Sequence, residues 1–171
     1  MGLPPRRPPG RGGWRERVLD PIFYLRAVIV VASLALVGLP LVADAVNLTL
    51  KPVSAGSEAC RIVTVIDGDT VSLWCADRGI VRARLVGIDT PELFSPACLS
   101  ELAAAQAAAW ALRRLIWQSE RIEARFDGTD RYARALVDLT LDGVPVARAM
   151  IAAGHGRAYD GGRRRGWCDA A

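Results

Sequence analysis

Residues 62–75 read Ile-Val-Thr-Val-Ile-Asp-Gly-Asp-Thr-Val-Ser-Leu-Trp-Cys, and this stretch decides the fold. A β-branched run at 62–66 is followed by Asp67-Gly68 and then by an alternating run at 71–75. An Asp-Gly pair between two such runs is a strong β-hairpin signal, because glycine accepts the backbone conformations of a tight turn. The stretch therefore predicts two antiparallel strands joined by a turn.

Two cysteines flank this hairpin at equal distances from its turn. Cys60 lies seven residues before the Asp-Gly pair, and Cys75 lies seven residues after it. Opposed residues of an antiparallel pair lie about 4.5–5.5 Å apart at Cα, within reach of a disulfide. A strict two-residue turn would make them a hydrogen-bonded pair, so the register needs an adjustment. We predict disulfides Cys60–Cys75 and, by elimination, Cys98–Cys168, with free buried thiols as the alternative.

The elements predicted around the hairpin complete a small domain. They are a third strand at 80–88, a long helix at 97–117, strands at 121–126 and 134–141 with a turn at Asp127-Gly128, and a short helix from Pro145 to Gly154. Three strands, a helix, two strands and a helix predict a mainly β (α+β) fold. The expected architecture is a five-stranded OB-fold Greek-key barrel, preceded by one amino-terminal hydrophobic helix.

An apolar run at 27–42 forms that amino-terminal helix. Residues 21–25 can lengthen the run toward the roughly 20 residues of a membrane span, because Arg26 can snorkel to the headgroups. Two interpretations remain open. Residues 21–45 are either a transmembrane signal anchor or a signal peptide cleaved after Ala45, at a small-x-small site.

The charges around the run predict its orientation. Arginines precede it and few basic residues directly follow it, so the positive-inside rule places the amino terminus in the cytoplasm. We expect a disordered basic cytoplasmic leader at 1–20, a linker at 46–59 and a domain at 60–171. That domain is membrane-anchored on the extracytoplasmic side, or secreted or periplasmic after cleavage. Paired cysteines agree with an oxidising compartment.

The net charge of the chain limits how it can bind a polyanion. The 171 residues include 22 Lys+Arg and 18 Asp+Glu, for a net charge of +4. Most of this excess lies in residues 1–45, and the remainder is nearly balanced. The domain is therefore not a generic basic coat for nucleic acid. Binding a polyanion would require a focused basic patch or a metal ion.

Acidic and basic residues gather at the predicted strand ends. These residues are Asp69 after the hairpin turn, Arg84 and Asp89 near the end of the third strand, Glu92 after Pro91, and Arg134 at the start of the fifth strand. Singly, each reads as a turn former or a surface residue. Together, two carboxylates and a carbonyl suit Ca²⁺, a third carboxylate can take a proton from water, and two arginines can bind a phosphate. The set predicts a metal-assisted phosphodiesterase.

Three motifs carry a family resemblance. Residues 66–70 (IDGDT), 84–92 (R-x₄-DTPE) and 130–134 (D-[KR]-Y-x-R) resemble the staphylococcal nuclease (thermonuclease-like) family in order and internal spacing. The resemblance covers roughly residues 60–159. It implies an OB-fold barrel and Ca²⁺-dependent cleavage of DNA or RNA that leaves a 3′-phosphate and a 5′-hydroxyl.

The resemblance also implies a role for each motif residue. The expected Ca²⁺ ligands are the carboxylates of Asp69 and Asp89 and the backbone carbonyl of Thr90. Glu92 would be the general base, and Arg84 and Arg134 would bind the scissile phosphate and stabilise the transition state. For substrate binding we expect Tyr132, which would contact a nucleotide phosphate or pack at the rim, and Tyr159, which would stack on a base.

The sequence departs from the family in two places. The segment after Glu92 is short, and the carboxy-terminal helix is missing or very short. A Cys98–Cys168 disulfide would substitute for that helix by fixing the end of the chain to the start of the long helix, a contribution of about 2–4 kcal/mol. Residues 163–165, three arginines, would contact a nucleic-acid backbone or form a solvated turn.

Three functional hypotheses follow, and the third, an envelope structural or assembly protein with the barrel as a scaffold, needs an apolar surface patch that the sequence does not show. The first is an exported nuclease, a monomer with DNA and/or RNA as substrate, with no protein partner and with membrane contact only through an uncleaved amino-terminal helix. The second is a non-catalytic OB-fold module that binds nucleic acid or protein and is displayed on the membrane. The presence of Arg84, Glu92 and Arg134 favours the first, because binding modules of this kind usually lose them.

Overall fold

The computed structural model describes residues 21–56 and 58–168. The expected cytoplasmic leader at 1–20 lies outside these residues. The chain divides at Pro40 into an amino-terminal unit and a domain that begins at Leu41.

The amino-terminal helix α2 spans Pro21–Leu50 and confirms the predicted hydrophobic helix. Its stretch Pro21–Ala43 has a mean hydropathy of 2.4 and is long and apolar enough to cross a membrane. The large apolar side chains between Ile22 and Val42 are exposed. A signal sequence has the same length and composition, so both interpretations of this segment stand.

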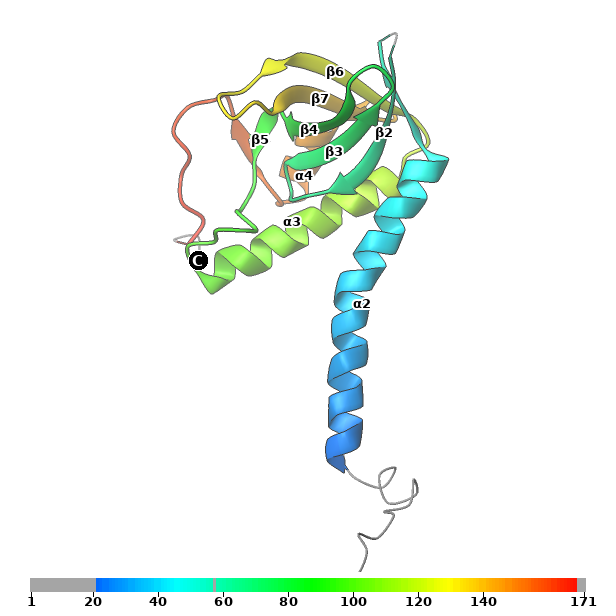
Figure 1. The fold of residues 1–171 in the computed structure, drawn as a ribbon. Helices are drawn as coiled ribbons and strands as arrows, with labels where there is room; N and C mark the ends of the chain where they lie inside the picture. Colours follow the sequence, from blue (N-terminus) through cyan, green and yellow to red (C-terminus); the bar gives the residue numbers. More distant parts are fainter. Residues whose placement is uncertain (1–20, 57, 169–171) are drawn as a thin grey trace, which may run out of the picture. The chain divides into compact units, whose positions relative to one another are not determined.

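A closed β-barrel forms the centre of the domain (Figure 1). Its strands are β1 (Pro52–Ala55), β2 (Glu58–Val65), β3 (Thr70–Cys75), β4 (Gly79–Leu85), β6 (Ile122–Thr129) and β7 (Ala135–Leu141). They lie in the order β4-β3-β2-β1-β6-β7, and a parallel pairing of β4 with β7 closes the barrel. The arrangement confirms the predicted α+β fold of the OB type.

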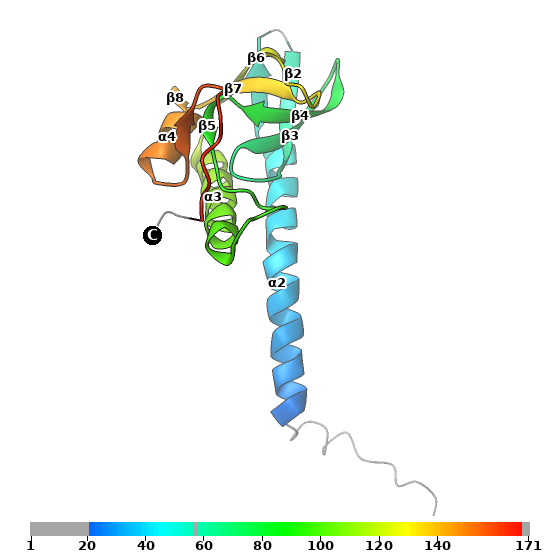
Figure 2. The same cartoon turned by 90° about the vertical axis from the view of Figure 1, so that its left-hand side faces the viewer.

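The remaining elements cover the barrel and extend from it (Figure 2). They are β5 (Gly87–Asp89), the long helix α3 (Leu99–Gln118), β8 (Val144–Pro145), the short helix α4 (Val146–Ala152) and β9 (Arg157–Tyr159). β5 and β9 form a separate two-stranded sheet. α3 lies across one end of the barrel and buries Leu112 and Ile116 in the core.

The barrel differs from the expected five strands in two places. The predicted linker 46–59 holds the end of α2, all of β1 and the start of β2. β1 belongs to the core because Val53 is buried and pairs with both neighbouring strands. The predicted strand 80–88 is divided into β4 and β5, because Gly87 has a φ of 81° and cannot continue an extended strand.

The turn between β6 and β7 lies later than predicted. Asp127 and Gly128 belong to β6, in a bulge of its pairing with β7. The chain reverses at residues 130–133, where the Ala133 amide donates to the Asp130 carbonyl at 3.1 Å. A bulge places two residues opposite one, and this displaces the turn along the strand.

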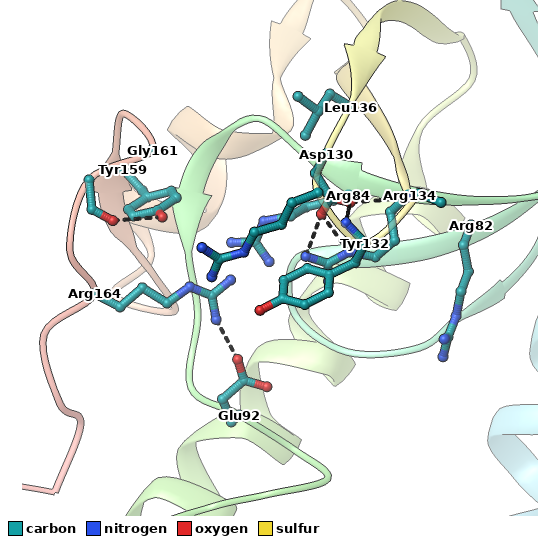
Figure 3. A pocket seen from close by; sticks show the side chains of 13 residues that line it. Arg82, Arg84, Glu92, Asp130, Tyr132, Arg134, Leu136, Tyr159, Gly161 and Arg164 are labelled. Carbon is teal, nitrogen blue, oxygen red and sulfur yellow. Dashed lines mark hydrogen bonds and ion pairs between the residues drawn. The ribbon is translucent and has the colours of Figure 1, made fainter.

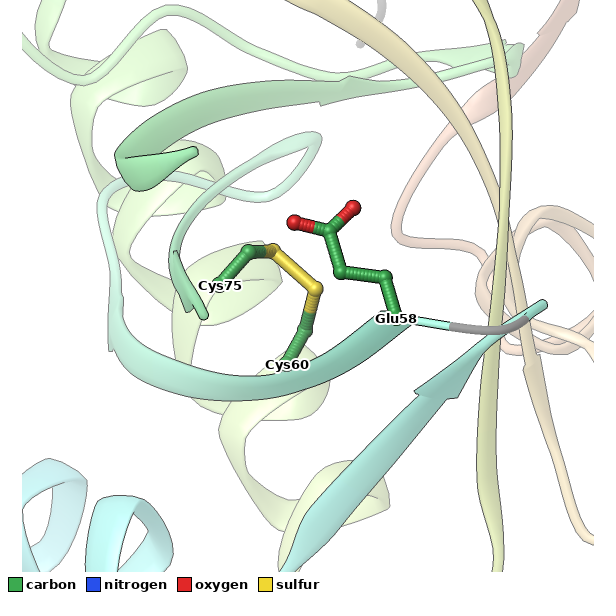
Figure 4. Close-up of side chains that lie close together, drawn as sticks. All are labelled: Glu58, Cys60 and Cys75. Carbon is green, nitrogen blue, oxygen red and sulfur yellow. A yellow bond between two sulfur atoms is a disulfide. The ribbon is translucent and has the colours of Figure 1, made fainter. Parts of the chain in front are cut away.

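Both predicted disulfides are present. Cys60 and Cys75 are directly opposed on β2 and β3 with Cα atoms 4.0 Å apart, and both lie in the core. A bulge between Ile62 and Thr64 supplies the register adjustment that the pairing needed. Glu58 lies beside this disulfide (Figure 4), and its carboxylate forms an ion pair with Arg78.

The β2–β3 turn packs directly on α3 through a glycine. A Cβ added to Gly68 would lie 2.7 Å from Cβ of Ala108 on α3 and 2.9 Å from the Thr90 hydroxyl oxygen. Both distances are below van der Waals contact. Glycine at this position therefore lets the turn, the helix and the loop after β5 meet.

We expect Gly68→Ala to lower the free energy of unfolding by about 1–3 kcal/mol, because the added methyl group overpacks this contact. Urea unfolding of the full-length protein in mild detergent measures the change. Gly162→Ala is the matched control, since its added Cβ lies no closer than 3.4 Å to another group. Equal stability of Gly68→Ala and wild type would show that the turn does not pack as described.

Candidate functional site

A buried ion pair forms the centre of the site. Asp69 directly precedes β3, Arg84 lies near the end of β4, and their side chains are 5% and 7% exposed. Arg84 Nη1 lies 2.8 Å from Asp69 Oδ1, which also accepts the Thr70 hydroxyl at 3.0 Å. The register of β3 and β4 pairs Thr70 with Arg84. The strand pairing therefore brings the carboxylate and the guanidinium together.

Arg84 also connects this ion pair to Asp89, the last residue of β5. Arg84 Nη2 lies 3.9 Å from Asp89 Oδ1 and donates to the Ile88 carbonyl at 3.4 Å. Asp89 and the following Thr90 are both buried. Burial raises the pKa of Asp89, and this effect exceeds the lowering by the neighbouring cations and by the indole of Trp167.

A further acidic side chain stands close to this centre. Burial and the charge of Asp69 raise the pKa of Asp67 to about 6. Asp67 Oδ1 accepts the backbone amide of Asp69 at 3.0 Å, which fixes the turn before β3. The β2–β3 turn therefore concentrates negative charge beside Arg84.

Glu92 lies in the loop between β5 and α3, and its side chain is 47% exposed. The buried carboxylate of Glu101, in the first turn of α3, holds this loop. One of its oxygens accepts the Glu92 amide at 3.3 Å, and the other accepts the Ala97 amide at 2.7 Å. A carboxylate at a helix amino terminus is favourably placed, because the free amides there carry partial positive charge.

Asp130 holds Arg134 in position. The Asp130 carboxylate pairs with Nε and Nη2 of Arg134 at 2.8 and 2.7 Å, and it accepts the backbone amides of Tyr132 and Arg134. Partial desolvation opposes ionisation, but these hydrogen bonds outweigh it and lower the pKa of Asp130. The β6–β7 turn therefore presents a charged, oriented guanidinium.

Of these groups, Arg84, Glu92, Asp130 and Arg134 line one pocket of about 790 Å³ (Figure 3). Its charged lining residues are Arg82, Arg84, Arg131, Arg134 and Arg164, with Glu92 and Asp130. The lining of this pocket holds five arginines and two acidic residues, so positive charge is concentrated there although the domain as a whole is nearly neutral. The pocket can therefore attract an anion such as a phosphate.

Two tyrosines also line the pocket. Tyr132 is well exposed, and the guanidinium carbons of Arg131 and Arg134 lie 4.9 and 5.6 Å from its ring centroid. Tyr159, at the end of β9, donates its hydroxyl to the Gly162 carbonyl at 2.8 Å. The pocket thus combines aromatic surface with positive charge.

The structure places the predicted site residues in two adjoining groups. Arg84, Glu92, Arg134, Tyr132 and Tyr159 line the pocket. Asp69, Asp89 and Thr90 are buried, and Arg84 connects the two aspartates to the pocket.

Sequence reasoning missed several contributors to the site, among them Arg164 and Trp167. Arg164, one of three arginines interpreted only as a nucleic-acid contact or a solvated turn, pairs with Asp89 and Glu92. Trp167 donates its indole N–H to Asp89 Oδ2 at 3.3 Å. The signal that could have found them was the predicted Cys98–Cys168 disulfide, because it requires the end of the chain to pass this edge of the barrel.

The residues present fit a hard divalent cation. The donor set consists of oxygens: the carboxylates of Asp69 and Asp89 and the backbone carbonyl of Thr90. Asp89 Oδ1 is buried, and within the described chain no hydrogen bond of good geometry reaches it; the positive charge nearest to it is the Arg164 guanidinium, whose Nε lies 3.0 Å away. A buried carboxylate needs a compensating positive charge, which a guanidinium or a metal cation can supply.

Two other clusters are poor candidates for a metal. They are Glu58 with Cys60 and Cys75, and Glu101 with Cys98 and Cys168. Each contains a disulfide, and a disulfide sulfur is not the thiolate that binds metal.

Comparison with known families agrees with the geometry. Residues 82–166 match the family model described as staphylococcal nuclease homologue, a range that includes Arg84, Asp89, Glu92 and Arg134. The barrel domain therefore belongs to the staphylococcal nuclease homologue family, a class of nuclease-type hydrolases. A search of curated proteins finds no match.

Asp67 makes stability depend on pH in a defined direction. The pKa of Asp67 in the folded protein is about 6, above the ordinary 3.8, so the folded state favours the protonated side chain. Its contribution to the free energy of unfolding is therefore complete below about pH 4 and is lost as the pH rises through 6. We expect Asp67→Asn to match wild type at pH 4 and to unfold with a free energy higher by on the order of 2 kcal/mol at pH 7. Urea titrations in a chelating buffer measure this.

The exposed Asp127→Asn is the control, and its curve should run parallel to that of wild type across this pH range. A parallel curve for Asp67→Asn would contradict a raised pKa at Asp67.

The two hydrogen bonds to Glu101 should keep the loop that carries Glu92 in one conformation. We expect Glu101→Ala to speed amide exchange in residues 92–97 by about tenfold, because two backbone amides lose their acceptor and local opening becomes easier. Hydrogen–deuterium exchange with mass spectrometry measures this, with the exposed Glu123→Ala on β6 as control. Unchanged exchange in this loop would mean that Glu101 does not position Glu92.

Proposed function

We propose that this domain is a Ca²⁺-dependent nuclease that hydrolyses phosphodiester bonds of DNA and/or RNA and leaves 3′-phosphate ends. The observation that carries the proposal is the pocket in which an exposed carboxylate and two positioned arginines face the same space. Glu92, Arg84 and Arg134 line it together, and the buried oxygen donors of Asp69 and Asp89 adjoin it. Membership of a nuclease-type family supports the reaction class.

Asp69, Asp89 and the Thr90 carbonyl would hold the cation. Their oxygens and their negative charge suit Ca²⁺, which binds oxygen ligands. When bound, the cation supplies a positive charge that polarises the phosphate. The buried ion pair of Arg84 with Asp69 keeps these groups fixed and separated from bulk water.

Glu92 acts as the general base. Its carboxylate is half exposed and lines the pocket, so a water that enters the pocket can donate a proton to it. Glu101 holds the Glu92 backbone from the opposite side, which limits the positions that the carboxylate can take.

Arg84 and Arg134 bind the non-bridging oxygens of the scissile phosphate and stabilise the charge that develops during attack. Each guanidinium is already oriented by an aspartate, Asp69 or Asp130, so little ordering remains when substrate binds. Tyr132 and Tyr159 contact the substrate beside this phosphate, and Tyr159 stacks on a base.

Residues 21–45 would anchor the nuclease domain in a membrane or direct it out of the cytoplasm. As a signal anchor, α2 keeps the domain on the extracytoplasmic side; cleavage after Ala45 releases a secreted or periplasmic form. The two disulfides support an oxidising compartment in either case. A monomer without a protein partner is proposed.

A non-catalytic binding module is the second candidate. The arginines and tyrosines of the pocket would suit it equally, since they bind nucleic acid without cleaving it. The two functions differ in what they require of Glu92, because only a nuclease needs a proton acceptor there.

Full-length protein in mild detergent should therefore cleave at least one of single- and double-stranded DNA and RNA with Ca²⁺, and none with EGTA. We expect Glu92→Gln to lower turnover roughly a hundredfold to ten-thousandfold with the fold intact by circular dichroism. Glu123→Gln on β6 is the matched control.

Two outcomes would contradict the proposal. Unchanged turnover in Glu92→Gln would remove Glu92 from the mechanism. A folded protein that binds these nucleic acids and cleaves none of them would favour the binding module.

A further inference from the structure

The carboxy-terminal tail, residues 160–168, runs along the site (Figures 1 and 2). It leaves β9 and reaches the start of α3, where Cys168 is bonded to Cys98. Arg157 of β9 holds it near its far end: its guanidinium carbon lies 3.7 Å from the Trp167 ring centroid, and it donates to the Gly166 carbonyl at 2.9 Å. The tail is therefore fixed at both ends.

This fixed tail places the Arg164 guanidinium beside two of the proposed functional acids, and Figure 3 shows its pair with Glu92. Arg164 Nε lies 3.0 Å from Asp89 Oδ1, and Arg164 Nη1 pairs with Glu92 Oε1. Trp167 donates to the other oxygen of Asp89. The tail thus contacts both oxygens of the proposed Ca²⁺ ligand and one oxygen of the proposed base.

We propose that Arg164 is the counter-ion of Asp89 and Glu92 in the cation-free protein, and that a divalent cation must displace it from Asp89 in order to bind there. The inference rests on the proposed function. The Asp89 side chain is only 6% exposed, so a guanidinium 3.0 Å from Oδ1 occupies the approach that a cation needs. Arg84 Nη2 already lies 3.9 Å from the same oxygen, so a cation bound beside both guanidinium groups would be repelled by them.

Arg164 carries its charge under all ordinary conditions. An arginine guanidinium is not deprotonated in proteins. The guanidinium therefore cannot leave the carboxylates by losing a proton. It leaves only by moving.

The pocket can accept the displaced Arg164 guanidinium. Arg164 lines the same pocket as Arg84 and Arg134, and its guanidinium carbon lies 5.7 Å from the Tyr159 ring centroid. Release from Asp89 and Glu92 would turn it toward a substrate phosphate and would free the Glu92 carboxylate. Arg164 is thus a positioning residue for the acids before cation binding and a third phosphate-binding arginine afterwards.

The disulfide makes this competition strong. Because Cys168 is bonded to Cys98, Arg164 stays close to Asp89 and pairs with it at a high effective concentration. Without that bond, ordering the tail would cost conformational entropy each time the ion pair formed. Loss of the disulfide should therefore weaken the competition without removing any ligand of the cation.

Calorimetric titration of the full-length protein with Ca²⁺, in mild detergent and without nucleic acid, tests the proposal. We expect Arg164→Gln to lower the Kd for Ca²⁺ by roughly tenfold, since the cation no longer has to break a partly buried ion pair. The control is Arg165→Gln, which removes the same charge from an exposed residue one position along. We expect its Kd to remain within about twofold of wild type.

The double variant Cys98→Ser/Cys168→Ser, with the Cys60–Cys75 disulfide retained, tests the role of the tail. We expect tighter Ca²⁺ binding than in wild type and a smaller further gain on adding Arg164→Gln. Equal or weaker Ca²⁺ affinity in Arg164→Gln relative to Arg165→Gln would overturn the proposal. If wild type still binds Ca²⁺ and cleaves nucleic acid, the proposed function survives that result; absence of Ca²⁺ binding in every variant overturns both.

Discussion

The site depends on one buried ion pair, that of Asp69 with Arg84. Taking two charges out of water is costly, and their attraction offsets this cost only when the geometry is good and other hydrogen bonds complete it. Here the 2.8 Å contact, the Thr70 hydroxyl and the Ile88 carbonyl supply that geometry. The start of β3 and the end of β4 are thereby held together, and Arg84 is fixed beside Asp89 and the pocket.

The cost of burying a charge also explains why the other acids of the site are paired with arginines. Asp89 lies beside Arg84 and Arg164, Glu92 pairs with Arg164, and Asp130 pairs with Arg134. A barrel edge that gathers several acids must have their charge compensated, and this chain does so with arginines. Arginine can both compensate these acids and bind a phosphate, because its planar guanidinium binds carboxylates and phosphates in the same bidentate way.

Local sequence patterns predicted the features that depend on neighbouring residues. The hairpin, its cysteine pair and the α+β barrel follow from alternation and turn residues, and three motifs indicated the family. Features set by distant contacts were not predictable in this way. β1 was missed because Val53 lies in a short polar stretch and is buried only once β2 and β6 flank it. Arg164 was missed because its partner Asp89 is 75 residues away in the sequence and meets it only along the path of the tail.

The central claim is that the buried oxygens of Asp69, Asp89 and Thr90 bind Ca²⁺ beside Glu92. Anomalous X-ray diffraction from crystals of the full-length protein grown with Ca²⁺ tests it most directly. The account predicts an anomalous peak among these three oxygens, with the Arg164 guanidinium moved away from Asp89. A bound Ca²⁺ elsewhere, or a site without anomalous density in which Arg164 still pairs with Asp89, would contradict it.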